Sequence, residues 1–231
     1  MAKRGQKGHT KRMAAPKAMP IHDKKSKVWI VSTGPGTHPA IKGIPLLVLL
    51  REMLGIVQNR REAKAILNGR KVLVDGVIRT DEKFPVGLMD VVAMPEANLY
   101  YKIIVKRGKL FAEKANKEDA GSKLLKVTGK KMLKGKKISI SLHDGRNLFA
   151  DNNVKVGDSI ILDVAAGGKM KKLLKFGKGA KCIITDGKHS GDHVVVEEVF
   201  PNSEGRPAEA LVSTKEGSYR TLAQYLFVVG E

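Results

Sequence analysis

Short apolar runs separated by turns make up most of the chain after residue 100, and they constrain its fold more than any other feature. Nine runs of four to six residues lie at 102–105, 109–112, 124–127, 137–142, 159–164, 181–185, 194–199, 210–213 and 225–229. Tight-turn dipeptides such as Asp144-Gly145 and Asp186-Gly187 separate some of them. Strands this short and this regularly spaced predict small β-barrels. The lysine-rich stretch 167–175, which opens with two glycines, is the predicted seam between two barrels.

Residues 43–94 have a different pattern, which predicts two helices, a hairpin and a strand. Apolar residues at helical spacing favour a helix over 44–54, with Pro45 in its first turn. Asn59 and Glu62 form a capping-box pattern at the start of a second helix, and Gly69 is expected to end it. Asp75-Gly76 then joins strands at 71–74 and 77–79 through a type I′ turn, and 91–94 is a further strand.

The first 40 residues predict an extended arm. Glycines and prolines interrupt every possible helix, and no core pattern is visible. We expect such a segment to be disordered alone in water and to be held in place by a bound polyanion.

Positive charge is concentrated in three segments. Residues 1–27, 121–137 and 167–181 hold 22 of the 43 Lys and Arg residues and one acidic residue, Asp23. The other 172 residues carry 21 basic and 22 acidic side chains and are almost neutral. This distribution suits a dense polyanion, and nucleic acid is the first candidate because neutralised phosphates release counterions. Aromatic residues make up 5% of the chain, so base stacking is not expected to be the main mode of binding.

Five basic residues of the two-helix region could converge on one nucleic-acid backbone. Arg60, Arg61 and Lys64 fall on the first turns of the second predicted helix, where free N–H groups and the helix dipole favour phosphate. Arg70 and Lys71 follow where the chain enters the hairpin. An ordinary solvated helix face is the alternative interpretation, and the spacing alone does not decide between the two.

Two stretches resemble known RNA-binding motifs. Residues 59–76 run from a helix rich in Arg and Lys through a glycine to Asp-Gly, and resemble the module first recognised in bacterial small-subunit ribosomal protein four. Residues 178–191 resemble the KOW motif of SH3-like barrels, with Lys188 and His189 pointing outward. A plain β-hairpin with a basic tip is the alternative for the second stretch.

The order of these parts is more specific than either motif. A basic arm, a two-helix module, a middle β-region and a KOW hairpin is the layout of the archaeal and eukaryotic small-subunit ribosomal protein S-four-e family, which this chain resembles. Strings at 8–17, 76–81, 85–92, 143–147 and 226–230 are also similar to that family, so the resemblance covers essentially the whole chain. An archaeal-type member is expected, because the basic C-terminal extension of eukaryotic members does not follow Gly230.

The resemblance implies an α+β, multi-domain protein. Its parts would be a basic extended arm (1–42), a small two-helix and β-hairpin RNA-binding module (43–94), a middle β-barrel-like domain (95–168) and an SH3-like KOW β-barrel (169–231). It implies a structural constituent of the cytoplasmic small ribosomal subunit, which clamps rRNA, in its 5′ domain, beside neighbouring ribosomal proteins. The residues expected to contact RNA are Lys3, Arg4, Lys7, His9, Lys11, Arg12, Lys17, Arg60, Arg61, Lys64, Arg70, Lys71, Arg79, Lys130, Lys131, Lys134, Lys171, Lys172, Lys178, Lys188 and His189.

The sequence predicts no enzyme, metal site, cofactor or small-molecule substrate. Cys182 is the only cysteine, which excludes an internal disulfide, and the six histidines lack the spacing of metal ligands. The sequence contains no run of about 18 apolar residues, which is the length that a membrane-spanning helix needs. A free RNA-binding translation or transcription factor is one alternative function. An RNA-modifying enzyme is another, but no segment is left over for its catalytic domain.

Overall fold

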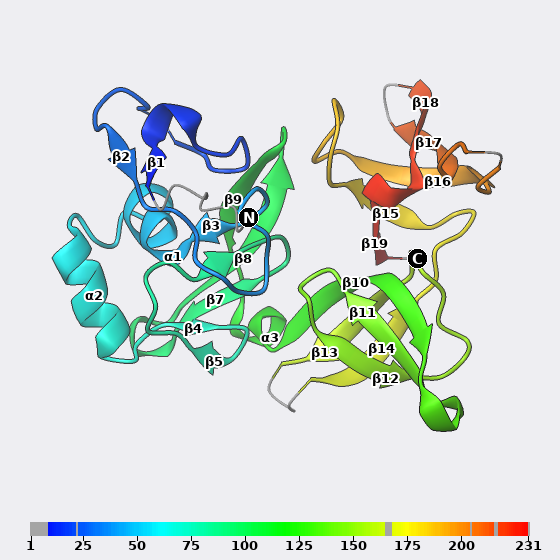
Figure 1. Cartoon of the computed structure of the whole chain (residues 1–231), viewed down its shortest axis with the longest axis horizontal. Coiled ribbons are helices and arrows are strands. Elements are labelled where there is room, and N and C mark those ends of the chain that lie inside the picture. Colours follow the sequence, from blue (N-terminus) through cyan, green and yellow to red (C-terminus); the bar gives the residue numbers. More distant parts are fainter. Residues whose placement is uncertain (1–8, 22, 165–167, 204, 215–216, 231) are drawn as a thin grey trace, which may run out of the picture. The chain divides into compact units, whose positions relative to one another are not determined.

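The computed structural model describes residues 9–21, 23–164, 168–203, 205–214 and 217–230. The chain divides into two compact units, Met1–Ile103 with Lys109–Lys114, and Ile104–Gly108 with Ala115–Glu231. Strands dominate both units and the helices are short, so the fold is α+β, as the sequence predicted (Figure 1). None of the described helices is long and apolar enough to cross a membrane.

A five-stranded sheet supports the N-terminal part of the chain, in the order β5-β4-β7-β8-β9. Two short antiparallel pairs accompany it, β1 with β2 and β3 with β6. The bounds of the strands are β1 (Thr10–Lys11), β2 (Trp29–Ile30), β3 (Ile44–Pro45), β4 (Leu73–Val74), β5 (Val77–Ile78), β6 (Pro85–Val86), β7 (Val91–Met94), β8 (Leu99–Lys106) and β9 (Lys109–Lys114).

The first helix is shorter than the predicted span of 44–54. Ile44 and Pro45 form β3, and the helix consists of α1 (Leu46–Val48) and a π-helical turn, Leu49–Met53. The first helical N–H groups need no cap, because those of Leu46 and Leu47 donate to the carbonyls of Phe84 and Glu82, each at 3.0 Å. Every residue from 44 to 50 is buried. A helical segment that is apolar on all sides is buried on all sides, so residues 46–50 belong to the first unit's core.

The second helix, α2 (Arg60–Asn68), confirms the predicted capping box at Asn59 and Glu62. It ends at Asn68 with Gly69 as its C-cap, as predicted, and it is the next residue, Arg70, that adopts the left-handed φ of 57° while Gly69 keeps a φ of −69°. The hairpin turn is confirmed, since both turn residues, Asp75 and Gly76, have the positive φ that a type I′ turn requires.

The arm contains core residues, contrary to the expectation from the sequence. Ala15, Met19 and Ile21 are buried, and Leu110 N donates to the carbonyl of Ala18 at 2.9 Å. Farther along, His38 is buried with its Nε2 3.0 Å from both carboxylate oxygens of Asp90. Apolar residues scattered irregularly among glycines and prolines give no periodic signal. The described part of the arm, from residue 9, therefore belongs to the first unit's fold.

The second unit contains the short helix α3 (Lys117–Ala120) and a five-stranded antiparallel sheet in the order β12-β11-β10-β13-β14. Its strands are β10 (Ser122–Met132), β11 (Ile138–Leu142), β12 (Asn147–Ala150), β13 (Ser159–Asp163) and β14 (Lys169–Leu174). The long strand β10 pairs with β13 along its first half and with β11 along its second, with a shift in register between Val127 and Gly129. Its core is a cluster of Leu125, Val127, Ile140, Leu142, Val154, Ile160 and Leu162.

A second antiparallel sheet follows, in the order β18-β17-β16-β15-β19. Its strands are β15 (Lys181–Ile184), β16 (His193–Phe200), β17 (Glu209–Thr214), β18 (Gly217–Leu222) and β19 (Leu226–Gly230). Because β14 pairs with β13, residues 169–174 belong to the preceding sheet and not to the part predicted to begin at 169. The sequence did not predict β12, β14 or β18, which are edge strands and need no continuous apolar run.

Candidate RNA-binding surfaces

The exposed face of α2 carries three of the predicted cations, and an acidic side chain partly neutralises it. Arg60, Arg61 and Lys64 are all exposed, whereas Ala63 and Leu67 face the core. Arg60 donates through Nε and Nη2 to the carboxylate of Glu82, and Lys64 Nζ lies 3.9 Å from the same group. The hydrogen bond to Glu82 raises the pKa of Arg60 and lowers that of the carboxyl. Arg61 is exposed, and the Glu82 contacts are those of Arg60 and Lys64.

The remaining cations of this module differ in how accessible they are to a ligand. Arg70 is exposed directly after α2, and Lys71 is exposed with its Nζ 2.7 Å from Glu96 Oε2. The guanidinium of Arg79 lies 4.2 Å from the ring centre of Phe84 and is half-buried. Arg79 therefore packs against the fold, while Arg70 and Lys71 remain accessible to phosphate.

The arm residues that were predicted to contact RNA lie in different environments. Lys11 and Lys17 are exposed, and His9 is exposed with its ring edge-on to Trp29, at 5.8 Å between centroids. Arg12 is buried, and its Nη1 and Nη2 donate to the two oxygens of Glu52 at 2.8 and 2.7 Å. Its predicted contact with RNA is therefore not supported, because the guanidinium already forms an internal ion pair. Lys3, Arg4 and Lys7 lie outside the described residues.

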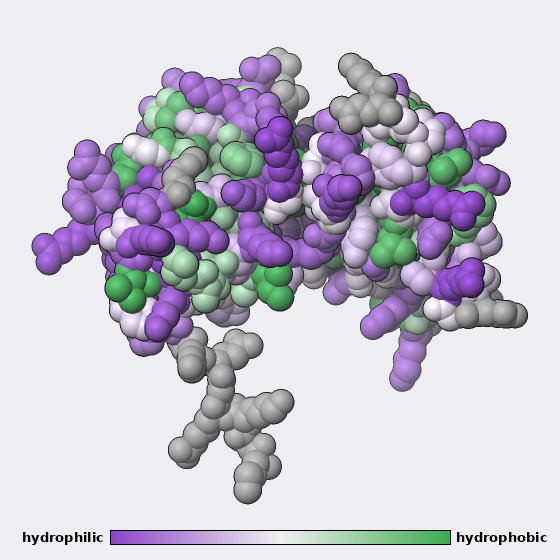
Figure 2. Space-filling view, turned by 90° about the horizontal axis from the view of Figure 1, so that it is seen from above, coloured by the Kyte–Doolittle hydropathy of each residue, from purple (hydrophilic) through white to green (hydrophobic). Residues whose placement is uncertain are grey.

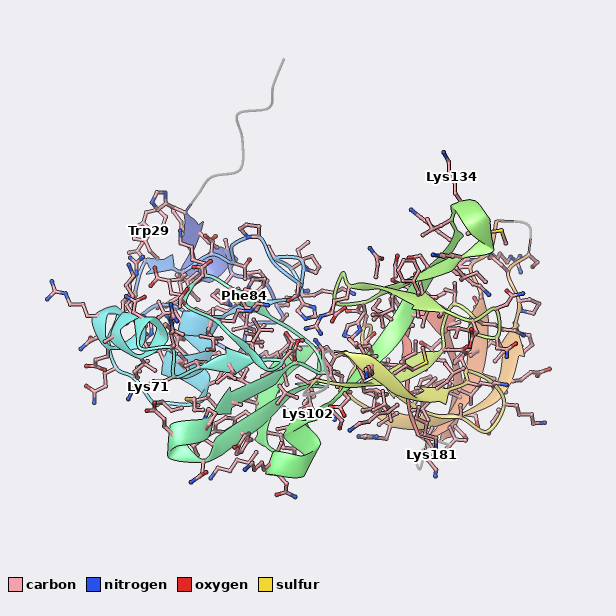
Figure 3. The ribbon with its side chains drawn as sticks, turned by 90° about the horizontal axis from the view of Figure 1, so that it is seen from below. Trp29, Lys71, Phe84, Lys102, Lys134 and Lys181 are labelled. Atoms are coloured by element: carbon pink, nitrogen blue, oxygen red, sulfur yellow. The ribbon has the colours of Figure 1, made fainter. Side chains whose placement is uncertain are left out.

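The hairpin between β10 and β11 carries a second group of cations. Lys131 and Lys134 are exposed, and Figure 3 shows Lys134 at the projecting end of the hairpin. Lys130 is half-buried, because its Nζ donates to the carbonyls of Asn152 and Val154 at 2.7 and 3.0 Å. Lys130 thus stabilises the loop that contains Asn152 and Val154, and the two exposed lysines remain available for phosphate.

The last group surrounds β14 and the turn after β15. Lys172, Lys178 and Lys188 are exposed, and Lys171 is exposed with its Nζ 2.9 Å from Asp163 Oδ2. The His189 ring stacks on Tyr219, with 4.3 Å between centroids. This stack lines a cavity of about 300 Å³, which Lys188, Arg220, Asp186 and Glu209 also line.

These cationic groups can neutralise phosphate. Most side chains on the visible face of each unit are hydrophilic (Figure 2). Among the described residues, His, Cys, Asp and Glu form no group of three or more that could hold a metal ion. Burial raises the pKa of the Cys182 thiol to about 12, so it is not a reactive nucleophile at neutral pH.

Sequence reasoning missed two exposed aromatic side chains near these cations. Trp29 is 56% exposed beside His9, and Phe149 is 73% exposed on β12. A strand alternates its side chains between two faces, so the apolar neighbour Leu148 could have indicated that Phe149 faces solvent. For Trp29, the available signal was an aromatic residue two positions after the basic segment 1–27.

Comparison with known proteins identifies the family. Three family models match the chain, the RS4NT (NUC023) domain over residues 4–40, the S4 domain over 44–92 and Ribosomal family S4e over 97–168. The small ribosomal subunit protein eS4 of Methanosphaera stadtmanae is 40% identical over 232 residues, which cover 100% of this chain and 95% of the relative. This chain belongs to the S4e family of ribosomal proteins. The family predicted from the order of the motifs is thereby confirmed.

Two further S4e proteins support this assignment. The eS4 protein of Methanocaldococcus jannaschii is 37% identical over 241 residues, covering 100% of this chain and 97% of the relative. The crystal structure of the 30S ribosomal protein S4e from Thermoplasma acidophilum matches with a TM-score of 0.71 and 32% identity, over 82% of this chain and 96% of that one. The S4e fold is therefore shared along most of the chain.

Proposed function

We propose that this protein is a structural constituent of the small ribosomal subunit that binds and clamps rRNA during assembly and translation. The observation that carries the proposal is the full-length similarity to proteins named small ribosomal subunit protein eS4. The protein is not an enzyme, because S4e is a family of ribosomal proteins. Its place is the cytoplasmic ribosome, and its partners are rRNA and neighbouring ribosomal proteins.

The exposed cations supply the mechanism. In the S4 domain, Arg61 lies on α2 and Arg70 and Lys71 follow its end, and Lys131 and Lys134 lie on the second unit. Each cation that meets a phosphate releases a counterion, so the binding is strong at low salt and weak at high salt. Folded surfaces then fix which RNA shape is held, and the charges supply most of the affinity.

The finer assignments are also proposals. We place the binding site in the 5′ domain of the rRNA, on the family resemblance. We divide the chain into a basic arm (1–42), an S4-type module (43–94), a middle β-barrel-like domain and an SH3-like KOW barrel, and we include β14 in the middle domain because it pairs with β13. The turn Asp186-Gly187-Lys188-His189 between β15 and β16 supports the KOW assignment.

Sedimentation tests the proposed function directly. The protein should travel with small subunits when a lysate of its own cells is separated on a sucrose gradient at low salt, and should leave them at high salt. The salt dependence follows from counterion release. A protein found mainly in the free fractions at low salt would instead support a free RNA-binding factor.

A further inference from the structure

The solvent face of β10, β11 and β12 has an unusual composition for the outside of a sheet. The cross-strand pairs Lys131↔Ser139 and Ser139↔Phe149 place these three side chains in one row, because directly opposite residues share a face. A second row contains Gly129, Ser141 and Asn147. The opposite face carries Ile140, Leu142 and Leu148 and belongs to the core. We call the outer set of six residues the β10–β12 platform.

Phe149 is the aromatic side chain of this platform. It is 73% exposed on an edge strand, although a phenyl ring has no polar group that benefits from water. Its neighbours across the strands are small or polar, so a flat ring from a ligand could lie on it without a clash. Ser141 Oγ lies 2.7 Å from Asn147 Oδ1, which fixes the Asn147 amide beside the ring.

Exposed lysines lie on the platform and at the nearby end of the β10–β11 hairpin. Lys131 lies on the platform, and Lys137 precedes β11 in extended conformation, two residues before Ser139, the cross-strand partner of Phe149. A position two residues from the directly opposite one is a diagonal neighbour, roughly 7–8 Å away by sheet geometry. Leu133 N donates to the carbonyl of Lys137 at 2.8 Å, which closes the hairpin and keeps Lys137 on the same face as Lys131. Lys134 extends from the hairpin end (Figure 3). Lys131, Lys134 and Lys137 are all exposed, and residues 121–137 contain no acidic residue, so an anionic partner is favoured over a basic peptide.

We propose that the β10–β12 platform binds an unpaired nucleotide of single-stranded RNA. Phe149 stacks on the base, the side chains of Ser139 and Asn147 form hydrogen bonds with its edge, and Lys131 and Lys137 contact the flanking phosphates. Stacking on an aromatic side chain tolerates any base, because every base has a π-face. The proposal rests on the RNA-binding function proposed above, and it identifies the class of RNA that this surface takes.

Affinity measurements on the full-length protein test the role of the ring. The probes are a fluorescein-labelled 12-nucleotide single strand and a 12-base-pair RNA duplex of the same sequence, followed by anisotropy. Phe149→Leu should bind the single strand about tenfold more weakly, because stacking contributes that much per base, and should bind the duplex unchanged. Phe149→Tyr keeps an aromatic ring and should bind as the wild type does. Val156→Ala, at a 57% exposed site outside the platform, is the matched control and should change neither affinity.

Photocrosslinking locates the contact independently of any variant. The same strand with 4-thiouridine in place of uridine is irradiated with the wild-type protein, and the products are digested with trypsin. Cleavage after Arg146 and Lys155 gives a peptide from 147 to 155, which should carry crosslinked nucleotide. The Phe149→Leu variant should lose that product.

Equal single-strand affinity of wild type and Phe149→Leu, or crosslinks confined to other peptides, would overturn the platform proposal. If the protein still sedimented with small subunits, its ribosomal function would stand. Small subunits carrying Phe149→Leu that lose a neighbouring protein while single-strand affinity is unchanged would assign the platform to a protein partner instead. A wild-type protein that bound neither probe nor the small subunit would contradict both proposals.

Discussion

At the scale of single residues, the pair of Arg12 and Glu52 shows how a basic residue in a basic segment can be structural. Burial raises the pKa of the Glu52 carboxyl, but hydrogen bonds from Arg12 and Arg51 outweigh it and leave the pKa lowered. Arg12→Leu leaves a nearly buried carboxylate with one partner, and we expect it to lower the free energy of unfolding by roughly 3 kcal/mol. Urea denaturation measures this, with the exposed neighbour Lys11→Leu as the control. A loss no larger than that of the control would contradict a structural role.

Glu82 provides a prediction on pH at the same scale. Its pKa is lowered chiefly by the hydrogen bond from Arg60, so the ionised carboxylate stabilises the folded state. This contribution is fully present above the unfolded pKa of about 4.3 and is lost as the pH falls through the lower folded pKa. Glu82→Gln should therefore lower the unfolding temperature at pH 7. It should also make the unfolding temperature fall less steeply as the pH is lowered from 7 to 2, which thermal unfolding at each pH measures. Glu96→Gln changes an exposed carboxyl and is the control. Its unfolding temperature should fall with pH as steeply as that of the wild type.

The sequence could place charged residues in segments, but it could not separate their roles. Lys11 and Arg12 are adjacent and equally basic, yet one is exposed and the other is buried against a residue 40 positions away. Lys123 belongs to a cationic run and is fully buried, with its Nζ 3.3 Å from Asp144 Oδ2. Such pairs depend on long-range contacts, and no local pattern encodes them.

At the scale of elements, α2 is where charge and fold can be tested separately. Arg61 and Arg70 are exposed and bear no part in the pair with Glu82, so reversing both to Glu should preserve the circular dichroism spectrum and the melting temperature. Affinity for a structured rRNA fragment should fall by at least tenfold, because each reversal puts repulsion against the phosphates. Reversing Arg60 instead places a carboxylate against Glu82 and should lower stability as well. Unchanged RNA affinity of the Arg61 and Arg70 variant would indicate an ordinary solvated helix face.

Elements that are set by the local sequence were predictable, and elements that depend on contacts with distant parts of the chain were not. The capping box of α2, the Asp75-Gly76 turn and the strand at 91–94 follow from local chemistry, and the structure confirms them. Ile44 was assigned to a helix because it continues an apolar run, but it pairs with Val86 across the chain. Strand β14, with three lysines, gave no strand signal because its position at a sheet edge lets its side chains remain in water.

At the scale of the whole molecule, the arm contributes positive charge and also contributes buried residues to the first unit. Deleting residues 1–27 removes buried Arg12, Ala15, Met19 and Ile21, so it should lower the unfolding temperature of that unit cooperatively, by calorimetry. Replacing Lys11, Lys17, Lys24, Lys25 and Lys27 by Gln removes five exposed charges and keeps those core residues.

This charge variant should unfold at the wild-type temperature, yet bind small-subunit rRNA more weakly. The slope of log affinity against log salt should fall by up to about five, because fewer counterions are released. A truncated protein that melts like the wild type would mean that the arm adds charge alone. An unaltered salt slope in the charge variant would mean that the arm's exposed lysines do not meet phosphate, and that the folded units bind the RNA without them.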